Sequence, residues 1–174
     1  MNSQFIMTLI GKDKPGIVES IAEIIANHGG NWEESKMCRL GGEFAGILRF
    51  SIPTSSKQKF LEAIPKIEAR GLSIMIKDSS QKTQQQNQKS AKLEIIGTDR
   101  PGIIQHISHV LAVKNVNFEE LESECISAPM SGNTIFKASA NISIPKDSDI
   151  NTLKNELEKL AEDLLVDINL TINC

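Results

Sequence analysis

The stretch GKDKPGIV at residues 11–18 returns almost unchanged as GTDRPGII at residues 97–104. Each copy follows an apolar segment and precedes apolar residues spaced three and four apart, the pattern of a helix that buries one face. The phrase therefore predicts a strand, a turn and a helix, written twice at a separation of 86 residues.

The repetition extends beyond the turn. When residues 11–34 are aligned with residues 97–120, ten of the 24 positions are identical, whereas average composition would give about one or two by chance. Most of the remaining positions keep their character, as in Lys14/Arg100 and Trp32/Phe118. We interpret the chain as an internal duplication.

A polar segment separates the two copies. Residues 79–90, SSQKTQQQNQKS, contain no apolar side chain, and such a segment cannot bury surface to offset the entropy of ordering it. The sequence therefore predicts a first domain at 1–78, a flexible linker at 79–90 and a second domain at 91–174.

Each copy has the element order β-α-β-β-α-β. This order predicts an α+β fold of the ferredoxin-like, split βαβ type, with one antiparallel sheet and both helices on one face. Pro65 is expected to kink or split the second helix of the first copy. The expected elements are strands 5–10, 31–40, 43–52, 72–77, 92–96 and 166–172, and helices starting near 17 and 103 and covering 57–69 and 150–164, the last with Leu153, Leu157, Leu160 and Leu164 facing inward.

The second copy carries six extra residues around Ser127–Asn133, between its second and third strands. A surface insertion explains this segment, and a loop that binds a partner or covers a ligand remains an alternative.

Composition limits the class of protein. Hydrophobic residues make up 40% and charged residues 24% of the chain, as in soluble globular proteins. The net charge is −3 and Lys and Arg are not clustered, so direct nucleic-acid binding lacks its usual electrostatic basis. No signal-peptide pattern or membrane-length apolar run occurs. Three widely spaced cysteines (Cys38, Cys125 and Cys174) indicate reduced thiols in a cytoplasmic protein.

The repeated turn has two chemical interpretations. Pro15 fits the first helical position, and Gly16 allows close approach to the backbone. The N–H groups at the helix start would attract a carboxylate or phosphate. Asp13 could cap the helix itself, or it could accept a ligand ammonium, in which case the turn would match a zwitterionic amino acid. Both interpretations remain open.

Asn31 and Asn117 each follow the Asp of their copy by 18 residues. The second strand is expected to return beside the turn, so that Asn and Asp converge. A turn residue at the start of a strand is the plainer alternative.

The sequence contains few of the residue patterns that an enzyme would need. His106 and His109 have a spacing that can hold a metal, but no neighbouring ligand completes a site. The pairs Glu33-Glu34 and Glu119-Glu120 are adjacent in strands, so their side chains are expected on opposite faces. No nucleophile-base set and no phosphate-binding motif occurs. We expect no catalysis, no cofactor and no metal.

The Gly-x-Asp-x-Pro-Gly turns, the helix faces after them, and the Asn-Trp and Asn-Phe pairs resemble a tandem pair of ACT domains. This resemblance implies regulatory modules that pair their sheets, here as a pseudo-dimer, and bind a small ligand, often an amino acid, at the interface. Carried over, the ligand-binding residues are Asp13, Lys14, Pro15, Gly16, Ile17, Asn31, Asp99, Arg100, Pro101, Gly102, Ile103 and Asn117.

The chain resembles above all the glycine cleavage system transcriptional repressor group. That resemblance implies an amino-acid sensor, with glycine as the first candidate, which controls transcription by contact with a transcription factor rather than with DNA. An adaptor that regulates a metabolic enzyme, and a structural pair that binds no ligand, are the alternatives. The partner and the formation of a homo-oligomer stay open.

Overall fold

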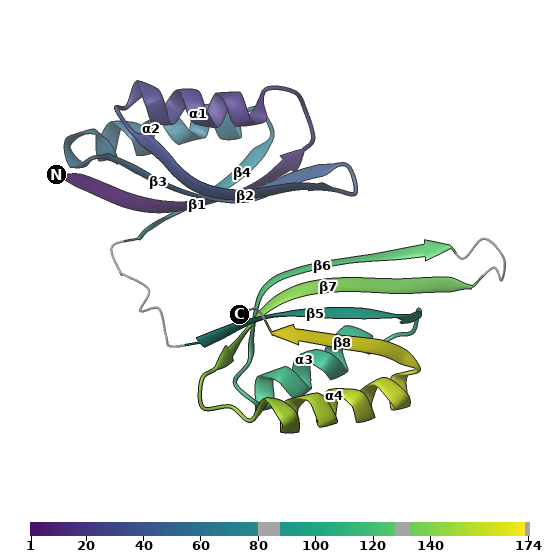
Figure 1. Ribbon diagram of the computed structural model, residues 1–174. Helices are drawn as coiled ribbons and strands as arrows, with labels where there is room; N and C mark the ends of the chain where they lie inside the picture. Colours follow the sequence, from purple (N-terminus) through teal and green to yellow (C-terminus); the bar gives the residue numbers. More distant parts are fainter. Residues whose placement is uncertain (80–87, 128–132, 173–174) are drawn as a thin grey trace. The chain divides into compact units, whose positions relative to one another are not determined.

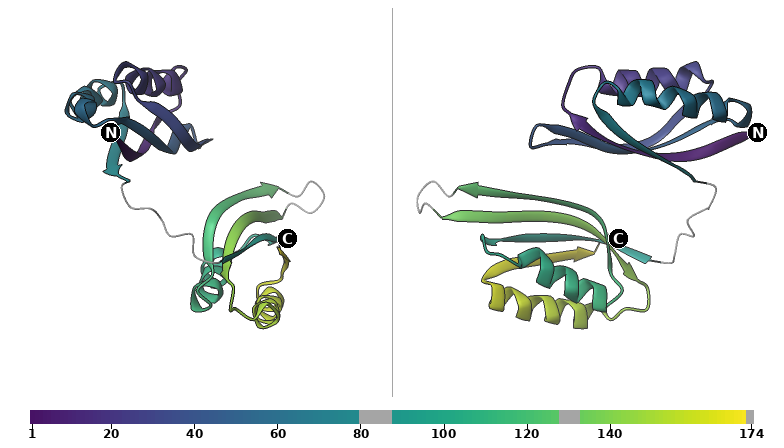
Figure 2. Two further views of the ribbon diagram at one scale, coloured as in Figure 1. Left: turned by 60° about the vertical axis from the view of Figure 1, so that its left-hand side comes forward. Right: turned by 180° about the vertical axis from the view of Figure 1, so that it is seen from behind.

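The computed structural model describes residues 1–79, 88–127 and 133–172. The chain divides into two compact units, Met1–Thr83 and Gln84–Cys174. Each unit is a four-stranded antiparallel sheet with two helices on one face (Figure 1). Two further views show the same two layers in each unit (Figure 2). The predicted fold class, two ferredoxin-like domains, is confirmed.

Both domains have the predicted element order. The first contains β1 (Asn2–Lys12), α1 (Ile17–Asn27), β2 (Asn31–Leu40), β3 (Glu43–Pro53), a 3-10 turn (Thr54–Ser56), α2 (Lys57–Glu68) and β4 (Leu72–Asp78). The second contains β5 (Gln88–Thr98), α3 (Ile103–Val113), β6 (Asn117–Ser127), β7 (Thr134–Pro145), α4 (Ile150–Leu164) and β8 (Val166–Ile172).

The expected linker ends earlier than its composition suggested. Residues 88–90 lie in β5, where they pair with Ser143–Pro145 of β7. Their polar side chains gave no strand signal, because backbone pairing with β7 rather than apolar burial holds this end of the strand. Residues 80–87 lie outside the described residues, as do residues 128–132 of the inserted segment in the second copy.

The sheets have the strand orders β2-β3-β1-β4 and β6-β7-β5-β8. The core of each domain lies between the sheet and its helices. In the first domain the fully buried rings of Phe5, Phe50 and Phe60 pack with centroids 5.5 and 5.2 Å apart. Each buried ring of this kind contributes about 1.5–3 kcal/mol. The second core is largely aliphatic around Leu93, Ile107 and Ile142, with Phe136 as an aromatic member.

Two expectations about helices had different outcomes. The helix α2 runs continuously from Lys57 to Glu68 with Pro65 inside it, so the expected split is wrong. Pro65 lies near the end of the helix, and its carbonyl still accepts the N–H of Ala69 at 3.0 Å. In α4, Leu153 and Leu157 are buried, and Leu160 and Leu164 pack half-buried against the same core, as predicted.

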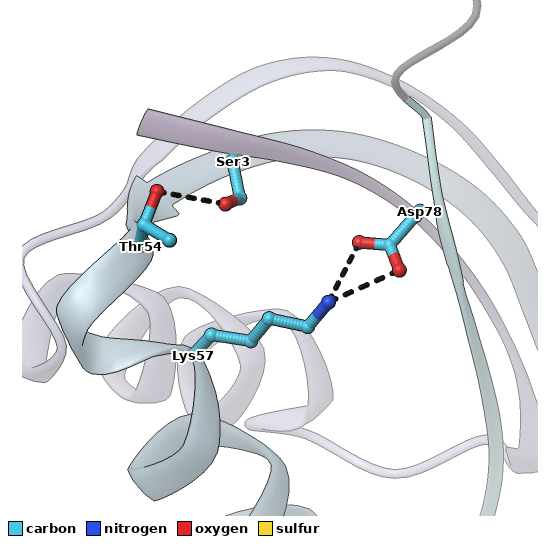
Figure 3. Close-up of polar contacts among 4 residues, drawn as sticks. All are labelled: Ser3, Thr54, Lys57 and Asp78. Carbon is cyan, nitrogen blue, oxygen red and sulfur yellow. Dashed lines mark hydrogen bonds and ion pairs between the residues drawn. The ribbon is translucent and has the colours of Figure 1, made fainter. Parts of the chain in front are cut away.

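Polar contacts close one end of the first domain (Figure 3). Ser3 Oγ on β1 lies 3.0 Å from Thr54 Oγ1, and Lys57 Nζ at the start of α2 donates to both carboxylate oxygens of Asp78 at 3.1 Å. The same ammonium lies 5.3 Å from the centre of the Phe5 ring. The Lys57–Asp78 contact attaches α2 to the end of β4, and the Ser3–Thr54 contact attaches the start of β1 to the 3-10 turn.

Candidate functional site

The first glycine of the repeated turn is required by packing. A Cβ on Gly11 would lie 2.5 Å from the carbonyl oxygen of Gly71. A Cβ on Gly97 would lie 2.6 Å from Val166 Cγ1 and 2.9 Å from the carbonyl oxygen of Leu165. Only a residue without a side chain lets the last strand of each domain approach this closely.

The aspartate that follows attaches the turn to the start of the neighbouring strand. The backbone N–H of Asp13 donates to the carbonyl of Gly42 at 3.0 Å, and that of Asp99 donates to Thr134 at 2.9 Å. Gly42 and Thr134 precede β3 and begin β7, respectively. In both domains the turn is therefore joined by the same backbone bond to the start of the neighbouring strand, β3 or β7.

The last glycine of the turn starts the helix. Gly16 and Gly102 are the N-cap residues of α1 and α3, with left-handed φ values of 90° and 94°. Pro15 therefore precedes the helix, and its expected place at the first helical position is wrong. At neither helix start does a side chain accept a capping bond from the backbone N–H groups, so the interpretation of Asp13 as a cap is also wrong.

The side chains of the predicted site residues divide into two kinds. Ile17 and Ile103 pack against the cores, the latter only 2% exposed. The turn residues before them are exposed apart from the half-buried Gly102; these are Asp13, Lys14, Pro15, Gly16, Asp99, Arg100 and Pro101. The turns therefore present backbone N–H groups and charged side chains to solvent, while the isoleucines anchor the helices.

The two aspartates have different neighbours. Asp13 Oδ2 lies 3.5 Å from Arg39 Nη1 on β2. At the corresponding position of β6 stands Cys125, whose thiol hydrogen-bonds Asp99. Partial desolvation, and then the negative charge and hydrogen bond of Asp99, raise the pKa of the Cys125 thiol. The first turn thus has a paired carboxylate, and the second has a carboxylate beside a neutral thiol.

Asn31 and Asn117 do not converge with the turns of their own domains. Asn31 pairs with Ser51 of β3, and Ser51 pairs with Gln4 near the start of β1, whereas the turn follows Lys12 at the other end of that strand. The eight residues between Gln4 and Lys12 span roughly 26 Å along the strand. In the second domain Asn117 and Ser90 both pair with Ser143, at the start of β5 and away from its turn. The predicted convergence is therefore wrong in both copies.

The paired glutamates also differ from expectation. A register shift between Trp32 and Glu34 makes Glu33 a bulge residue. As a result both carboxylates reach Arg49: Glu33 Oε2 lies 3.4 Å from Nε, and Glu34 Oε2 lies 2.9 Å from Nη2. The expectation that adjacent residues face opposite sides fails, because the bulge breaks the alternation.

The second domain has the same bulge, with a register shift between Phe118 and Glu120. Asn141 stands where the first domain has Arg49, and its Nδ2 donates to Glu120 Oε2 at 3.0 Å. The two bulges therefore have the same backbone geometry and different charge.

One histidine of the pair bonds to the start of its own helix. His106 Nδ1 lies 2.7 Å from the carbonyl oxygen of Gly102, within its own helix. Over residues 1–79, 88–127 and 133–172, no three His, Cys, Asp or Glu side chains are arranged to hold a metal ion. In the same part of the chain, none of the helices is both long enough and apolar enough to cross a bilayer.

Two hollows lie away from the turns. One, of about 710 Å³, lies on the second sheet between Ile96, Lys137 and Glu122. The other, of about 260 Å³, lies between α1 and α2, where Arg70 Nη1 donates to Ser20 Oγ at 3.0 Å. Neither hollow is lined by any of the twelve predicted site residues, and no sequence pattern pointed to them.

Comparison with known proteins agrees with this architecture. The family model for the ACT domain matches residues 3–77. The glycine cleavage system transcriptional repressor of Escherichia coli (strain K12) is 26% identical over 119 residues, covering 68% of this chain and 63% of that protein. The chain thus spans under two thirds of that relative. A UPF0237 protein of Methanopyrus kandleri is 35% identical over 79 residues, covering 45% of this chain and 81% of that protein.

Two solved structures match the whole chain. A protein of unknown function from Galdieria sulphuraria superposes with a TM-score of 0.89 at 28% identity, covering 100% of both chains. A candidate glycine cleavage system transcriptional repressor superposes with a TM-score of 0.71 at 19% identity, covering 99% of this chain and 98% of that one. The first domain therefore belongs to the ACT-domain family, and the second domain repeats the same fold.

Proposed function

We propose that the protein is a cytoplasmic, non-catalytic regulator that senses a small amino acid, with glycine as the first candidate, and controls a transcription factor by direct contact. The observation that carries this proposal is the exposed turn built twice, with an uncapped helix start beside an aspartate. The similarity to the Escherichia coli repressor supports the regulatory role.

The chemistry of each turn suits a zwitterion. The first N–H groups of α1 and α3 and the positive end of each helix dipole favour a carboxylate. Asp13 and Asp99 on the same turns favour an ammonium group. Because Asn31 and Asn117 lie roughly 26 Å from the turn of their own domain, they would touch the same ligand only if a different copy of the fold supplied them.

The bond from each aspartate to its hairpin gives binding a mechanical consequence. A ligand that moves the 13–16 turn also moves the Gly42 end of the β2–β3 hairpin, because the Asp13 N–H holds the two together. A ligand acts as a regulator when it binds one of two arrangements more tightly than the other. A partner that contacts the hairpin would bind the two arrangements with different affinities.

Calorimetry on the full chain with each of the twenty amino acids tests sensing. Asp13→Asn and Asp99→Asn keep the shape of the turn and remove its charge, so each is expected to weaken binding about tenfold, as for loss of one charge-assisted hydrogen bond. Asp149→Asn, at the start of α4, is the matched control and should leave binding unchanged. If none of the twenty amino acids binds, sensing is refuted, and the alternative of a structural pair that binds no ligand remains.

Affinity capture with the full chain from its native cell tests the partner. Recovery of a transcription factor, strengthened or weakened by the amino acid that calorimetry selects, is the expected result. Recovery of a metabolic enzyme with the same ligand dependence would instead establish the adaptor role.

A further inference from the structure

The space between the two helices of the first domain has an apolar floor and a polar rim. The helices α1 and α2 lie side by side on one face of the sheet (Figure 2), and we call the hollow of about 260 Å³ between them the helix groove. Its floor is formed by apolar side chains that are buried or half-buried: Ile24, Ala63 and Ile67. Its rim is formed by polar side chains from both helices and the residues that follow them: Ser20, Glu23, Asn27, His28, Lys66 and Arg70.

The helix pairs of the two domains can be compared position by position. The separation of 86 residues that aligns the repeated turns also aligns α1 with α3. The buried residues of α2 and α4 align those helices, since Phe60 and Ile64 match Leu153 and Leu157. Three positions of the helix groove then differ in character between the domains: His28 against Lys114, Ala63 against Glu156, and Arg70 against Asp163.

An ion pair spans the corresponding helices of the second domain. Lys114 Nζ at the end of α3 lies 2.8 Å from Glu156 Oε1 on α4. In the first domain Ala63 has no side chain long enough to cross between the helices, so the apolar floor stays open to a ligand. The second domain shows that the fold can be built with this place bridged, and the open groove is therefore a property of the first domain.

Both ends of the helix groove are held in position by contacts within the chain. At one end His28 Nδ1 lies 2.7 Å from the carbonyl oxygen of Ile24, and the His28 ring meets the Phe60 ring edge-on with centroids 5.5 Å apart. At the other end Arg70 Nη1 donates to Ser20 Oγ at 3.0 Å. A groove whose walls are already ordered loses little conformational entropy when a ligand binds.

The charge of the rim favours an anion. Two cations, Lys66 and Arg70, face one carboxylate, Glu23, across the hollow. A guanidinium has five N–H donors, so the single bond to Ser20 positions Arg70 and leaves donors for a second acceptor. A carboxylate is the group that such a planar donor binds best, through two parallel hydrogen bonds. In the second domain Asp163 reverses the charge at this position.

We propose that the helix groove is a binding site for a small organic carboxylate with a compact, branched apolar body. Its carboxylate would bind Arg70 and Ser20, and its body would cover Ile24, Ala63 and Ile67. The hollow holds about nine water-sized volumes, which suits a body of a few carbon atoms. Inorganic anions have no apolar part to cover the floor. A ligand this small in an open groove is expected to bind at about millimolar concentration.

Occupation of the helix groove reaches the start of α1 through one side chain. Ser20 Oγ, which accepts from Arg70, donates to the carbonyl of Gly16 at 2.9 Å. Gly16 is the N-cap residue of α1. A carboxylate that takes over donors of Arg70 changes the contacts of Ser20, so the backbone signals next to Gly16 are expected to respond to the ligand.

Two-dimensional ¹H–¹⁵N spectra of the full chain, at constant pH and ionic strength, test the site with isovalerate as the probe. Amide signals of α1, of the end of α2 and next to Gly16 should shift and saturate at millimolar isovalerate. The neutral amide isovaleramide should bind about tenfold more weakly, as for loss of a charge-assisted hydrogen bond. Acetate, which has the charge without the body, should also bind more weakly. Signals of α3 and α4 are the internal control and should stay in place.

Two substitutions on the rim should act in opposite directions. Arg70→Gln removes the cation and is expected to weaken isovalerate binding about tenfold, to the level of isovaleramide. Glu23→Gln removes the carboxylate that repels the ligand and should strengthen binding about twofold to threefold. Asp163→Gln, at the position of the second domain that corresponds to Arg70, is the matched control and should leave binding unchanged.

The double variant Ala63→Glu with His28→Lys transfers the ion pair of the second domain into the helix groove. It should abolish the shifts caused by isovalerate, and its own spectrum shows whether the domain is folded. Equal binding of isovalerate and isovaleramide, shifts that lie outside α1 and α2, or an Arg70→Gln variant that binds isovalerate as the native chain does would each overturn the proposal. Absence of any saturating shift in the native chain would overturn it as well.

Discussion

The backbone N–H of Asp13 donates to the carbonyl of Gly42 at 3.0 Å, across the gap between the β1–α1 turn and the β2–β3 hairpin. The second domain makes the equivalent bond from Asp99 to Thr134. Together with the close approach at Gly11 and Gly97, this bond shows that much of the repeated phrase is needed to build the turn. What remains for a ligand is the exposed helix start and the aspartate side chain.

Replacement of the first glycine of either turn should be strongly destabilising. In Gly11→Ala and Gly97→Ala the new Cβ would overlap backbone atoms of the last strand. Overpacking of this kind costs about 1–3 kcal/mol. Denaturant unfolding of the full chain measures the loss. Gly41 has a positive φ and no atom within 4 Å of its Cβ position, so Gly41→Ala measures the backbone cost alone. A loss below about 1 kcal/mol in Gly11→Ala would contradict the packing argument.

The helix-start glycines should differ from each other. Gly16→Ala places an L-residue in the left-handed region, which costs about 1–2 kcal/mol. Gly102→Ala has the same cost, and its Cβ would also lie 3.1 Å from the His106 ring. We therefore expect the larger loss of unfolding free energy in Gly102→Ala. Adding His106→Ala should remove the difference, and if the difference persists the ring is not its cause.

Asp149 should make stability depend on pH in the acid range. Thr152 Oγ1 donates to its Oδ2 at 2.7 Å and the Asn151 N–H donates to its Oδ1 at 2.9 Å. These two bonds, the Thr152 bond foremost, lower the pKa of the Asp149 carboxyl from its usual 3.8. A lowered pKa gives stability that is present in full above the usual pKa and is lost as pH falls through the folded value.

Thermal unfolding at several pH values checks this contribution. Asp149→Asn keeps a capping oxygen and should lose the acid dependence that this residue supplies, while Asp149→Ala should lose both the dependence and the cap. An unchanged acid profile in Asp149→Asn would show that the carboxylate contributes nothing.

The bulge in the first domain should respond to salt. Arg49→Gln leaves the Glu33 and Glu34 carboxylates side by side without their guanidinium. Since Arg49 is about half exposed, the expected loss is at most about 1 kcal/mol and should shrink at high ionic strength. The reciprocal Asn141→Arg adds a guanidinium beside Glu119 and Glu120. Unfolding at two salt concentrations measures the change in unfolding free energy of both variants. If the loss of stability in Arg49→Gln is the same at both salt concentrations, charge is not its cause.

Sequence reasoning predicted well where a local signal was strong. The bounds of β2, α4 and β8 agree with expectation, because Gly41-Gly42 defines the hairpin and the leucine spacing defines the last helix. The duplication made the element order certain to repeat. These features depend on neighbours in the chain, which the sequence displays directly.

The candidate site was harder to predict because it depends on strand order. Asn31 starts β2, and β2 lies on the far side of β3, parallel to β1, so Asn31 begins at the end of the sheet opposite the turn. The bulge at Glu33 has no hydrophobic pattern of its own. The only available signal was the recurrence of two consecutive glutamates after an aromatic residue. Likewise, Gly16 in the left-handed region moved the helix start beyond Pro15.

The bulge recurs at the same place in both sheets, and this recurrence indicates that the bulge is older than the duplication. A backbone irregularity shared by two copies was inherited from the single domain that preceded the duplication, as were the two glycines of the turn. The residue beside the aspartate differs between the copies, Arg39 in the first and Cys125 in the second. The shared backbone and the differing side chains therefore separate what the fold requires from what each half can vary.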